Sequence, residues 1–121
     1  MNKMIKLSVN EKVFEIEIEP YLTLAECLRD KLGFLGVKAS CNEGECGTCT
    51  ILMDGEAICS CMSLAVEAEG KQIVTIEGLE INGVLHPLQE SFIENHGMQC
   101  GYCTPGMILS AKSLLDTDAD P

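Results

Sequence analysis

Eight of the 121 residues are cysteine, and their spacing constrains the fold more than any other feature of the sequence. Cys41, Cys46 and Cys49 form a C-x4-C-x2-C run, and Cys61 follows with eleven residues in between. Glycines and cysteines are so frequent over residues 33–49 that neither a helix nor a strand would tolerate the segment. We therefore expect a long ordered loop that needs something to order it.

The cysteines belong to an acidic chain with no visible export signal. Residues 1–6 lack the continuous apolar segment of a secretory signal, and no stretch approaches the roughly 18 apolar residues that span a bilayer. We therefore expect a soluble, cytoplasmic protein, and reducing conditions there favour metal ligation or redox chemistry over disulfides. A formal net charge of −11 disfavours nucleic acid and anionic membranes, and a basic protein partner fits better.

The spacing of Cys41, Cys46, Cys49 and Cys61 matches the plant-type ferredoxin pattern for a [2Fe-2S] cluster. Glycines between the loop cysteines allow backbone turns in which N–H groups converge on an anionic cluster. A structural zinc site is the alternative, although zinc ribbons usually present two separated C-x2-C knuckles. Cys59 competes with Cys61 for the fourth position, because residues two apart on a strand point to the same face.

A second motif, Gln99-Cys100-Gly-Tyr-Cys103-Thr-Pro-Gly, places a C-x2-C pair just before an expected helix. The N-terminus of a helix favours the thiolate form of cysteine through its dipole and free N–H groups. From the residues alone, a redox dithiol, half a zinc site and half an iron-sulfur site are equally good interpretations of this pair.

The pattern of apolar residues predicts a sheet with one helix in the first 76 residues. Strict alternation over residues 4–19 predicts two strands, joined by a short hairpin at Asn10-Glu11. Thr23 and Glu26 form a capping box for a helix that ends at Gly33. Asp54-Gly55 predicts a hairpin between strands at 50–53 and 56–59, and a further strand is expected at 72–76.

Two helices are expected in the remainder, so the chain divides into an α+β domain at 1–76 and a helical part at 77–121. The first helix is expected from Pro87 to Asn95 with Gly97 as its cap, and the second from Thr104 to about residue 115, with Pro105 at its first position. The second helix carries a wide apolar stripe that one neighbouring helix cannot cover. We therefore expect either a partner over this stripe or a chain that has been cut short. The stripe comprises Met107, Ile108, Ala111, Leu114 and Leu115.

These motifs together resemble the small iron-sulfur subunit of molybdenum hydroxylases, the xanthine dehydrogenase family. The resemblance rests on Cys41 with the following GECGTC, on Ser60-Cys61, and on the segment from Gln99 to Met107, and it spans nearly the whole chain. It implies a ferredoxin-like β-grasp domain with one [2Fe-2S] cluster, followed by a four-helix domain with a second cluster beside the molybdopterin of a large partner subunit.

The resemblance also implies roles for individual residues. Cys41, Cys46, Cys49 and Cys61 would hold the first cluster, Cys100 and Cys103 would supply two of the four ligands of the second, and Gln99 would approach the molybdopterin. The family takes its other two thiolates from a later C-R-C motif, which does not occur before Pro121. We therefore expect a chain that contains half of the four-helix bundle, apparently truncated.

The expected function is electron transfer from the molybdenum site of a large molybdopterin-binding subunit towards an FAD-binding subunit. No nucleophile with a neighbouring base, no pair of carboxylates in a plausible cleft and no phosphate-binding loop is visible, so we expect no catalytic residue in this chain. The alternative is a stand-alone [2Fe-2S] ferredoxin, which accounts for residues 41–61 but not for the C-x2-C pair. Cys27 falls on the apolar face of the first helix and is expected to be a buried bystander.

Overall fold

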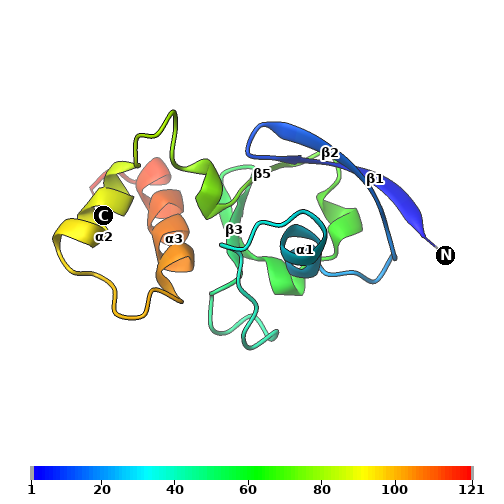
Figure 1. Ribbon diagram of the computed structural model, residues 1–121, viewed down its shortest axis with the longest axis horizontal. Coiled ribbons are helices and arrows are strands. Elements are labelled where there is room, and N and C mark those ends of the chain that lie inside the picture. The colour runs from blue at the N-terminus through cyan, green and yellow to red at the C-terminus, as the bar shows by residue number, and fades with distance from the viewer. Residues whose placement is uncertain (1, 121) are drawn as a thin grey trace.

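The computed structural model describes residues 2–120 and contains a five-stranded mixed sheet with three α-helices, as expected for an α+β chain (Figure 1). The strand order is β2-β1-β5-β3-β4, in which β1 and β5 are parallel and the other neighbours antiparallel. The strands are β1 (Lys3–Val9), β2 (Lys12–Ile18), β3 (Thr50–Met53), β4 (Glu56–Cys59) and β5 (Gln72–Val74). The α-helices are α1 (Leu24–Glu26), α2 (Pro87–Glu94) and α3 (Thr104–Thr117).

The predicted hairpin between β1 and β2 is present, although its turn contains no glycine. Asn10 and Glu11 both take positive φ angles, 52° and 67°, which are the values that a tight hairpin turn requires. The Asn10 side chain bonds the end of the neighbouring strand β5, since its Oδ1 accepts from the Thr75 N–H at 3.0 Å and its Nδ2 donates to the Thr75 hydroxyl at 2.9 Å. The turn is therefore tied to the segment after β5.

The predicted helix after Thr23 forms, but most of it is not an α-helix. Both halves of the capping box are present between Thr23 and Glu26. After α1 the chain continues as a π-helical turn from Cys27 to Lys31, and Gly33 leaves it with a φ of 80°. Cys27 is fully buried beside Leu24 and Leu28, in agreement with its expected role in packing. The periodicity of apolar residues alone does not distinguish a π turn from an α turn.

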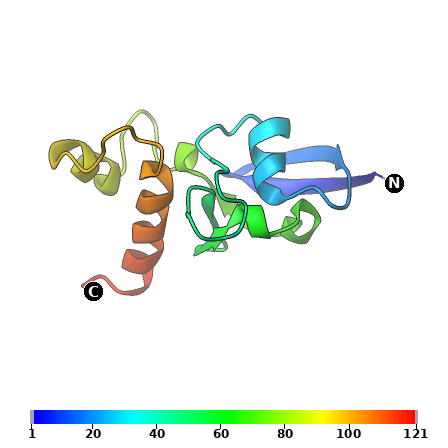
Figure 2. The same ribbon diagram turned by 90° about the horizontal axis from the view of Figure 1, so that it is seen from below.

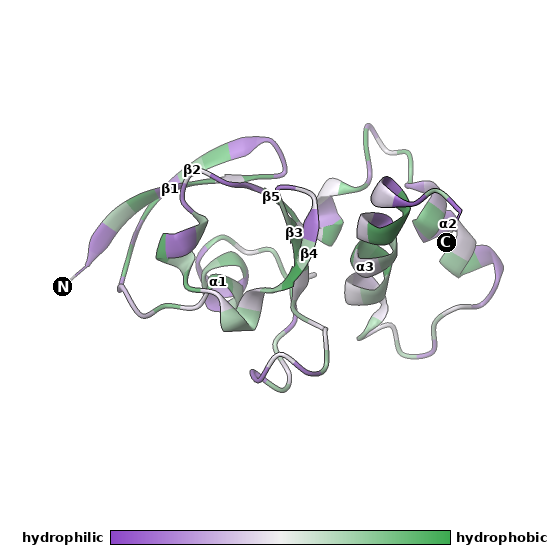
Figure 3. Cartoon of the chain, turned by 180° about the vertical axis from the view of Figure 1, so that it is seen from behind, coloured by the Kyte–Doolittle hydropathy of each residue, from purple (hydrophilic) through white to green (hydrophobic). Residues whose placement is uncertain are grey.

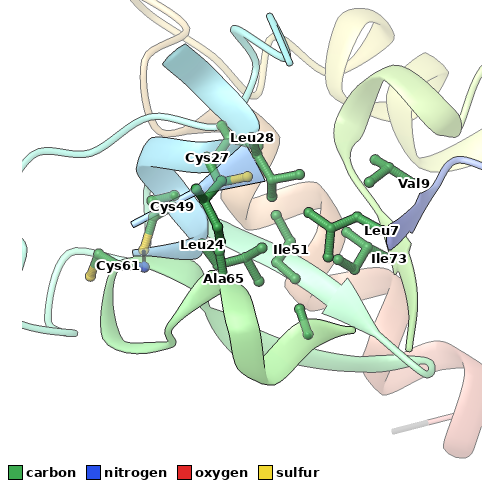
Figure 4. Packing of buried hydrophobic residues seen from close by; sticks show 14 of the residues in the cluster. Leu7, Val9, Leu24, Cys27, Leu28, Cys49, Ile51, Cys61, Ala65 and Ile73 are labelled. Atoms are coloured by element: carbon green, nitrogen blue, oxygen red, sulfur yellow. Dashed lines mark hydrogen bonds between the residues drawn. The ribbon is translucent and has the colours of Figure 1, made fainter. Parts of the chain in front are cut away.

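Strand β3 is buried on both faces, and this double burial joins the two halves of the chain. Ile51 packs into the main core between the sheet and α1 (Figure 4). Leu52 faces the other way and packs with Ile108 and Leu109 of α3. Figures 1 and 2 show α1 and α3 on opposite sides of the sheet at β3. Residues with alternate directions on one strand thus bury the helical half of the chain against the ferredoxin-like half.

Both C-terminal helices form, with differences at their ends. Gly97 does not supply the left-handed cap of α2, because His96 takes the positive φ of 55° and the Gly97 N–H bonds the Phe92 carbonyl at 2.8 Å. In α3 the N-cap position belongs to Cys103, so Pro105 is the second helical residue and not the first. Helix α3 runs two residues beyond the expected end.

The apolar stripe of α3 is divided between two environments. Ile108 and Leu109 are buried against the sheet, a neighbour that the sequence analysis did not consider. Met107, Leu114 and Leu115 stay exposed, and hydrophobic residues are visible along α3 and on α2 in Figure 3. No helix within residues 2–120 has the length and apolar character that crossing a membrane requires.

Candidate metal centre

The loop that precedes β3 turns its backbone N–H groups towards the sulfur of Cys41. The N–H groups of Glu43, Glu45 and Cys46 lie 3.3, 3.4 and 3.4 Å from that sulfur. Such convergence requires left-handed backbone between the donors, and Gly44 supplies it with a φ of 80°. Three N–H groups thus converge on one sulfur, the arrangement found around the sulfurs of anionic iron-sulfur sites.

A second cysteine pair forms where the β3–β4 hairpin begins and ends. The Cys61 N–H lies 3.4 Å from the Cys49 sulfur, and Figure 4 shows this contact between the sulfur of Cys49 and the backbone nitrogen of Cys61. Between Cys59 and Cys61, the buried Ser60 hydroxyl donates to the Cys49 carbonyl at 2.6 Å. This hydrogen bond fixes the end of β4 against the first residues of β3.

The arrangement of the four sulfurs fits a [2Fe-2S] cluster. Contacts from a backbone N–H to a sulfur join the residues two by two, Cys46 to Cys41 and Cys61 to Cys49, and a cluster with two irons and four thiolates needs two sulfurs for each iron. Across residues 2–120, no three His, Cys, Asp or Glu side chains are gathered in the way that a single metal ion would require. The N–H groups around the sulfurs supply the local positive potential that an anionic cluster needs.

The pKa values of the thiols differ with their surroundings. A hydrogen bond from the Thr48 hydroxyl, with smaller contributions from the Thr48 backbone and from Cys41, lowers the pKa of Cys46 to about 6. Burial and a hydrogen bond with Cys49 raise the pKa of Cys61 to about 11. Binding a metal at Cys61 therefore releases a proton at neutral pH, whereas the exposed Cys46 is already a thiolate.

The structure separates Cys59 from Cys61 in a way that strand alternation does not predict. Strand β4 ends at Cys59, and residues 60–62 form a 3₁₀ turn, so the two side chains are not on one strand face. Cys61 is 7% exposed, and Cys59 is half-buried with its sulfur 3.8 Å from the Gly44 carbonyl oxygen. The expectation that both cysteines share a strand face was therefore wrong, because the strand stops too early.

The second motif forms a site of its own. Gln99, Cys100 and Cys103 line one cavity of about 320 Å³, and both cysteines are exposed. A positive φ of 86° at Gly101 folds the loop back on itself. The ammonium group of Lys38 lies 5.6 Å from the centre of the Tyr102 ring, a cation–π contact that ties this loop to the N-terminal half.

The two cysteine sites are neighbours, although more than 50 residues separate Cys46 from Cys103 in the sequence. Both of these cysteines line one cavity of about 350 Å³. Both loops lie at the lower edge of the molecule in Figure 1. Gly106 of α3 lies so close to the Gly47 carbonyl oxygen that a Cβ on Gly106 would overlap it. This contact brings the start of α3 directly onto the first cysteine loop.

Three residues of this site were not predicted from the sequence. Thr48 bonds the Cys46 sulfur, Ser60 bonds the Cys49 carbonyl, and Gly106 permits the close approach of α3. The positions of Thr48 and Ser60 next to ligand cysteines were a usable signal, since hydroxyls beside thiolates commonly donate to them. No local signal exists for Gly106, because its partner Gly47 is distant in the sequence.

The chain matches two known families of iron-sulfur domains. Residues 7–75 match the 2Fe-2S iron-sulfur cluster binding domain, and residues 75–121 match a [2Fe-2S] binding domain. The first match covers the loop and the hairpin, and the second covers the C-x2-C pair and α3. The chain belongs to the iron-sulfur subunit family of molybdenum hydroxylases. A [2Fe-2S] cluster is thus the cofactor of this family member, as the cysteine spacing predicted.

Named relatives support this membership. The nicotinate dehydrogenase small FeS subunit of Eubacterium barkeri is 45% identical over 100% of this chain and 78% of the relative. The caffeine dehydrogenase subunit gamma of Pseudomonas sp. (strain CBB1) is 44% identical over 95% of this chain and 69% of the relative. Quinoline 2-oxidoreductase from Pseudomonas putida 86 superposes with a TM-score of 0.96 at 43% identity, over 99% of this chain and 74% of that one. These family members are parts of oxidoreductases, and the predicted role as an iron-sulfur subunit of an oxidoreductase is confirmed.

Proposed function

We propose that Cys41, Cys46, Cys49 and Cys61 hold the [2Fe-2S] cluster, and that the chain relays electrons from a molybdopterin-binding partner subunit to an FAD-binding one. The observation that carries this proposal is the cavity shared by Cys46 and Cys103, since it places the two cysteine sites side by side. A [2Fe-2S] cluster accepts and donates one electron at a time. A chain with two adjacent cluster sites is suited to relaying single electrons.

The residues of the chain would set how easily the first site is reduced. The three N–H groups on Cys41 and the one on Cys49 offset the negative charge of the thiolates, which favours reduction in a chain as acidic as this one. Burial of Cys49 and Cys61 excludes water from one side of the site. The exposed Cys41–Cys46 side is the side that a partner could approach.

The second site would be completed from outside the described residues. We propose that Cys100 and Cys103 are two of its ligands and that Gln99, which lines the same cavity, approaches the molybdopterin. Support for a separate helical domain comes from the family match over 75–121, which begins close to the proposed boundary at residue 76. All eight cysteines are unpaired, which supports the proposed cytoplasmic location because thiols stay reduced there.

Removing one ligand from each pair tests the proposal. The Cys46→Ala/Cys49→Ala double variant should lose the iron, the acid-labile sulfide and the electron paramagnetic resonance signal of the first cluster. The control is Cys27→Ala, which removes a buried cysteine of the same domain that is not an assigned ligand and should keep all three. A double variant that retains iron and signal at the level of the control would overturn the ligand assignment.

A further inference from the structure

The first cluster site contains one sulfur more than a [2Fe-2S] cluster uses. Cys59 is the last residue of β4 and pairs with Thr50, the residue that directly follows Cys49. Its sulfur lies against the cysteine loop, because it approaches the Gly44 carbonyl oxygen in the middle of the loop at 3.8 Å. A fifth thiol therefore lies among the four thiols assigned to the cluster.

Cys59 and Cys61 flank Ser60, a residue whose position is fixed by hydrogen bonds. The Ser60 hydroxyl and N–H both bond the Cys49 carbonyl, at 2.6 and 3.4 Å, and Ser60 itself is fully buried. Each neighbour of Ser60 thus starts from a backbone position that is anchored next to Cys49. A sulfur that takes the place of Cys61 from this anchor needs no rearrangement of the Cys41–Cys49 loop.

The pKa of Cys59 reflects its surroundings in the site. Burial is the largest cause that raises its pKa, followed by the nearby Cys49, Cys41 and Cys46 thiols. Three of the four assigned ligands are thus neighbours of the Cys59 sulfur, which agrees with its contact with Gly44.

We propose that Cys59 is a reserve ligand of the first [2Fe-2S] cluster, able to replace Cys61 as the partner of Cys49. This inference rests on the proposed ligand set. The exchange involves no oxidation or reduction: Cys59 gives its thiol proton to solvent as its sulfur bonds iron, and the bond from iron to Cys61 is lost. When Cys61 is still present, its released thiolate takes up a proton in turn.

The test compares single and double variants of the complete protein. Cys61→Ala should keep iron, sulfide and a paramagnetic signal of the first cluster, with the signal changed in shape. Cys59→Ala/Cys61→Ala should hold at least about tenfold less iron at that site, since even partners outside the ligand shell contribute ten- to a hundredfold to metal affinity. The control Cys27→Ala/Cys61→Ala also removes two cysteines and should behave as Cys61→Ala does.

A labelling measurement keeps the test decisive if a variant is unstable. Iodoacetamide followed by mass spectrometry should modify the half-buried Cys59 in the iron-loaded wild type and leave it unmodified in iron-loaded Cys61→Ala. Loss of the cluster from folded Cys61→Ala, or equal labelling of Cys59 in both proteins, would overturn the inference. A wild type without a cluster would instead refute the proposed function, so the two failures are distinguishable.

Discussion

Gly106 at the start of α3 lies against the carbonyl oxygen of Gly47 in the first cysteine loop, with no room between them for a Cβ atom. Both residues also line the cavity between Cys46 and Cys103. The absence of one side chain therefore sets the distance between the two halves of the chain at the point where the cysteine sites meet.

The contact can be tested with Gly106→Ala, because the sign of the change in folding stability depends on it. Helix propensity alone would make Gly106→Ala stabilising by up to about 1 kcal/mol. The collision with Gly47 should instead make it destabilising by about 1–3 kcal/mol, as overpacking usually does. Urea unfolding measures the difference. Ser110→Ala, an exposed change in the same cavity, is the control and should have little effect.

The buried thiol of Cys27 should make the stability fall at alkaline pH. Burial raises the pKa of Cys27 from 9.0 to about 11, and the nearby Lys31 offsets this rise only in part. Between these values the unfolded chain loses the proton while the folded chain keeps it, so stability should decrease as pH rises from about 9 to 11. The loss is on the order of 2 kcal/mol.

The experiment compares unfolding free energies of wild type and Cys27→Ala from about pH 8 to about pH 11, a range that includes both pKa values. At the lowest pH, the unfolding free energy of Cys27→Ala should be below that of the wild type, because the substitution leaves a small cavity in the core. Its curve should then approach that of the wild type as pH rises. Parallel curves across the whole range would contradict the burial of a protonated thiol.

The Ser60 hydroxyl should stabilise the hairpin end that presents Cys61. Ser60→Ala removes a buried hydrogen bond to the Cys49 carbonyl, which should cost about 1 kcal/mol of folding free energy and speed the loss of iron to a chelator. The control is Ser40→Ala, which changes an exposed serine beside Cys41. Equal rates of iron loss in the two variants would show that Ser60 does not hold the site together.

Asn10 should connect the first hairpin to the rest of the sheet. Asn10→Gly keeps the backbone free to adopt the positive φ but removes both side-chain hydrogen bonds to Thr75. We expect a loss of about 1–2 kcal/mol in a urea titration. Glu11→Gly is the matched variant, since Glu11 also has a positive φ, and it should be neutral or stabilising.

Much of this molecule could be predicted from short sequence windows, because hairpins, caps and ligand spacing are local. The turn at Asp54-Gly55, the capping box at Thr23 and the cysteine loop without helix or strand all follow from residues within a few positions of each other. The assignment of four cysteines to one cluster also came from local spacing, and it stays a prediction.

The features that could not be predicted depend on contacts between distant segments. The packing of Ile108 in one cluster with Leu52 buries part of the α3 stripe, and the fit of Gly106 against Gly47 brings the two cysteine motifs together. The separate directions of Cys59 and Cys61 follow from the point at which β4 ends, and this in turn depends on the Ser60–Cys49 hydrogen bond.

The most direct test of the ligand set is the alkylation of individual cysteines with and without iron. Cys46 is exposed and Cys59 half-buried, so burial cannot protect Cys46 better than Cys59. With iron bound, Cys41 and Cys46 should resist alkylation while Cys59 reacts. Once iron is removed, Cys41 and Cys46 should react as well. Rapid alkylation of Cys46 in the iron-loaded protein would contradict the assignment of the cluster to this loop.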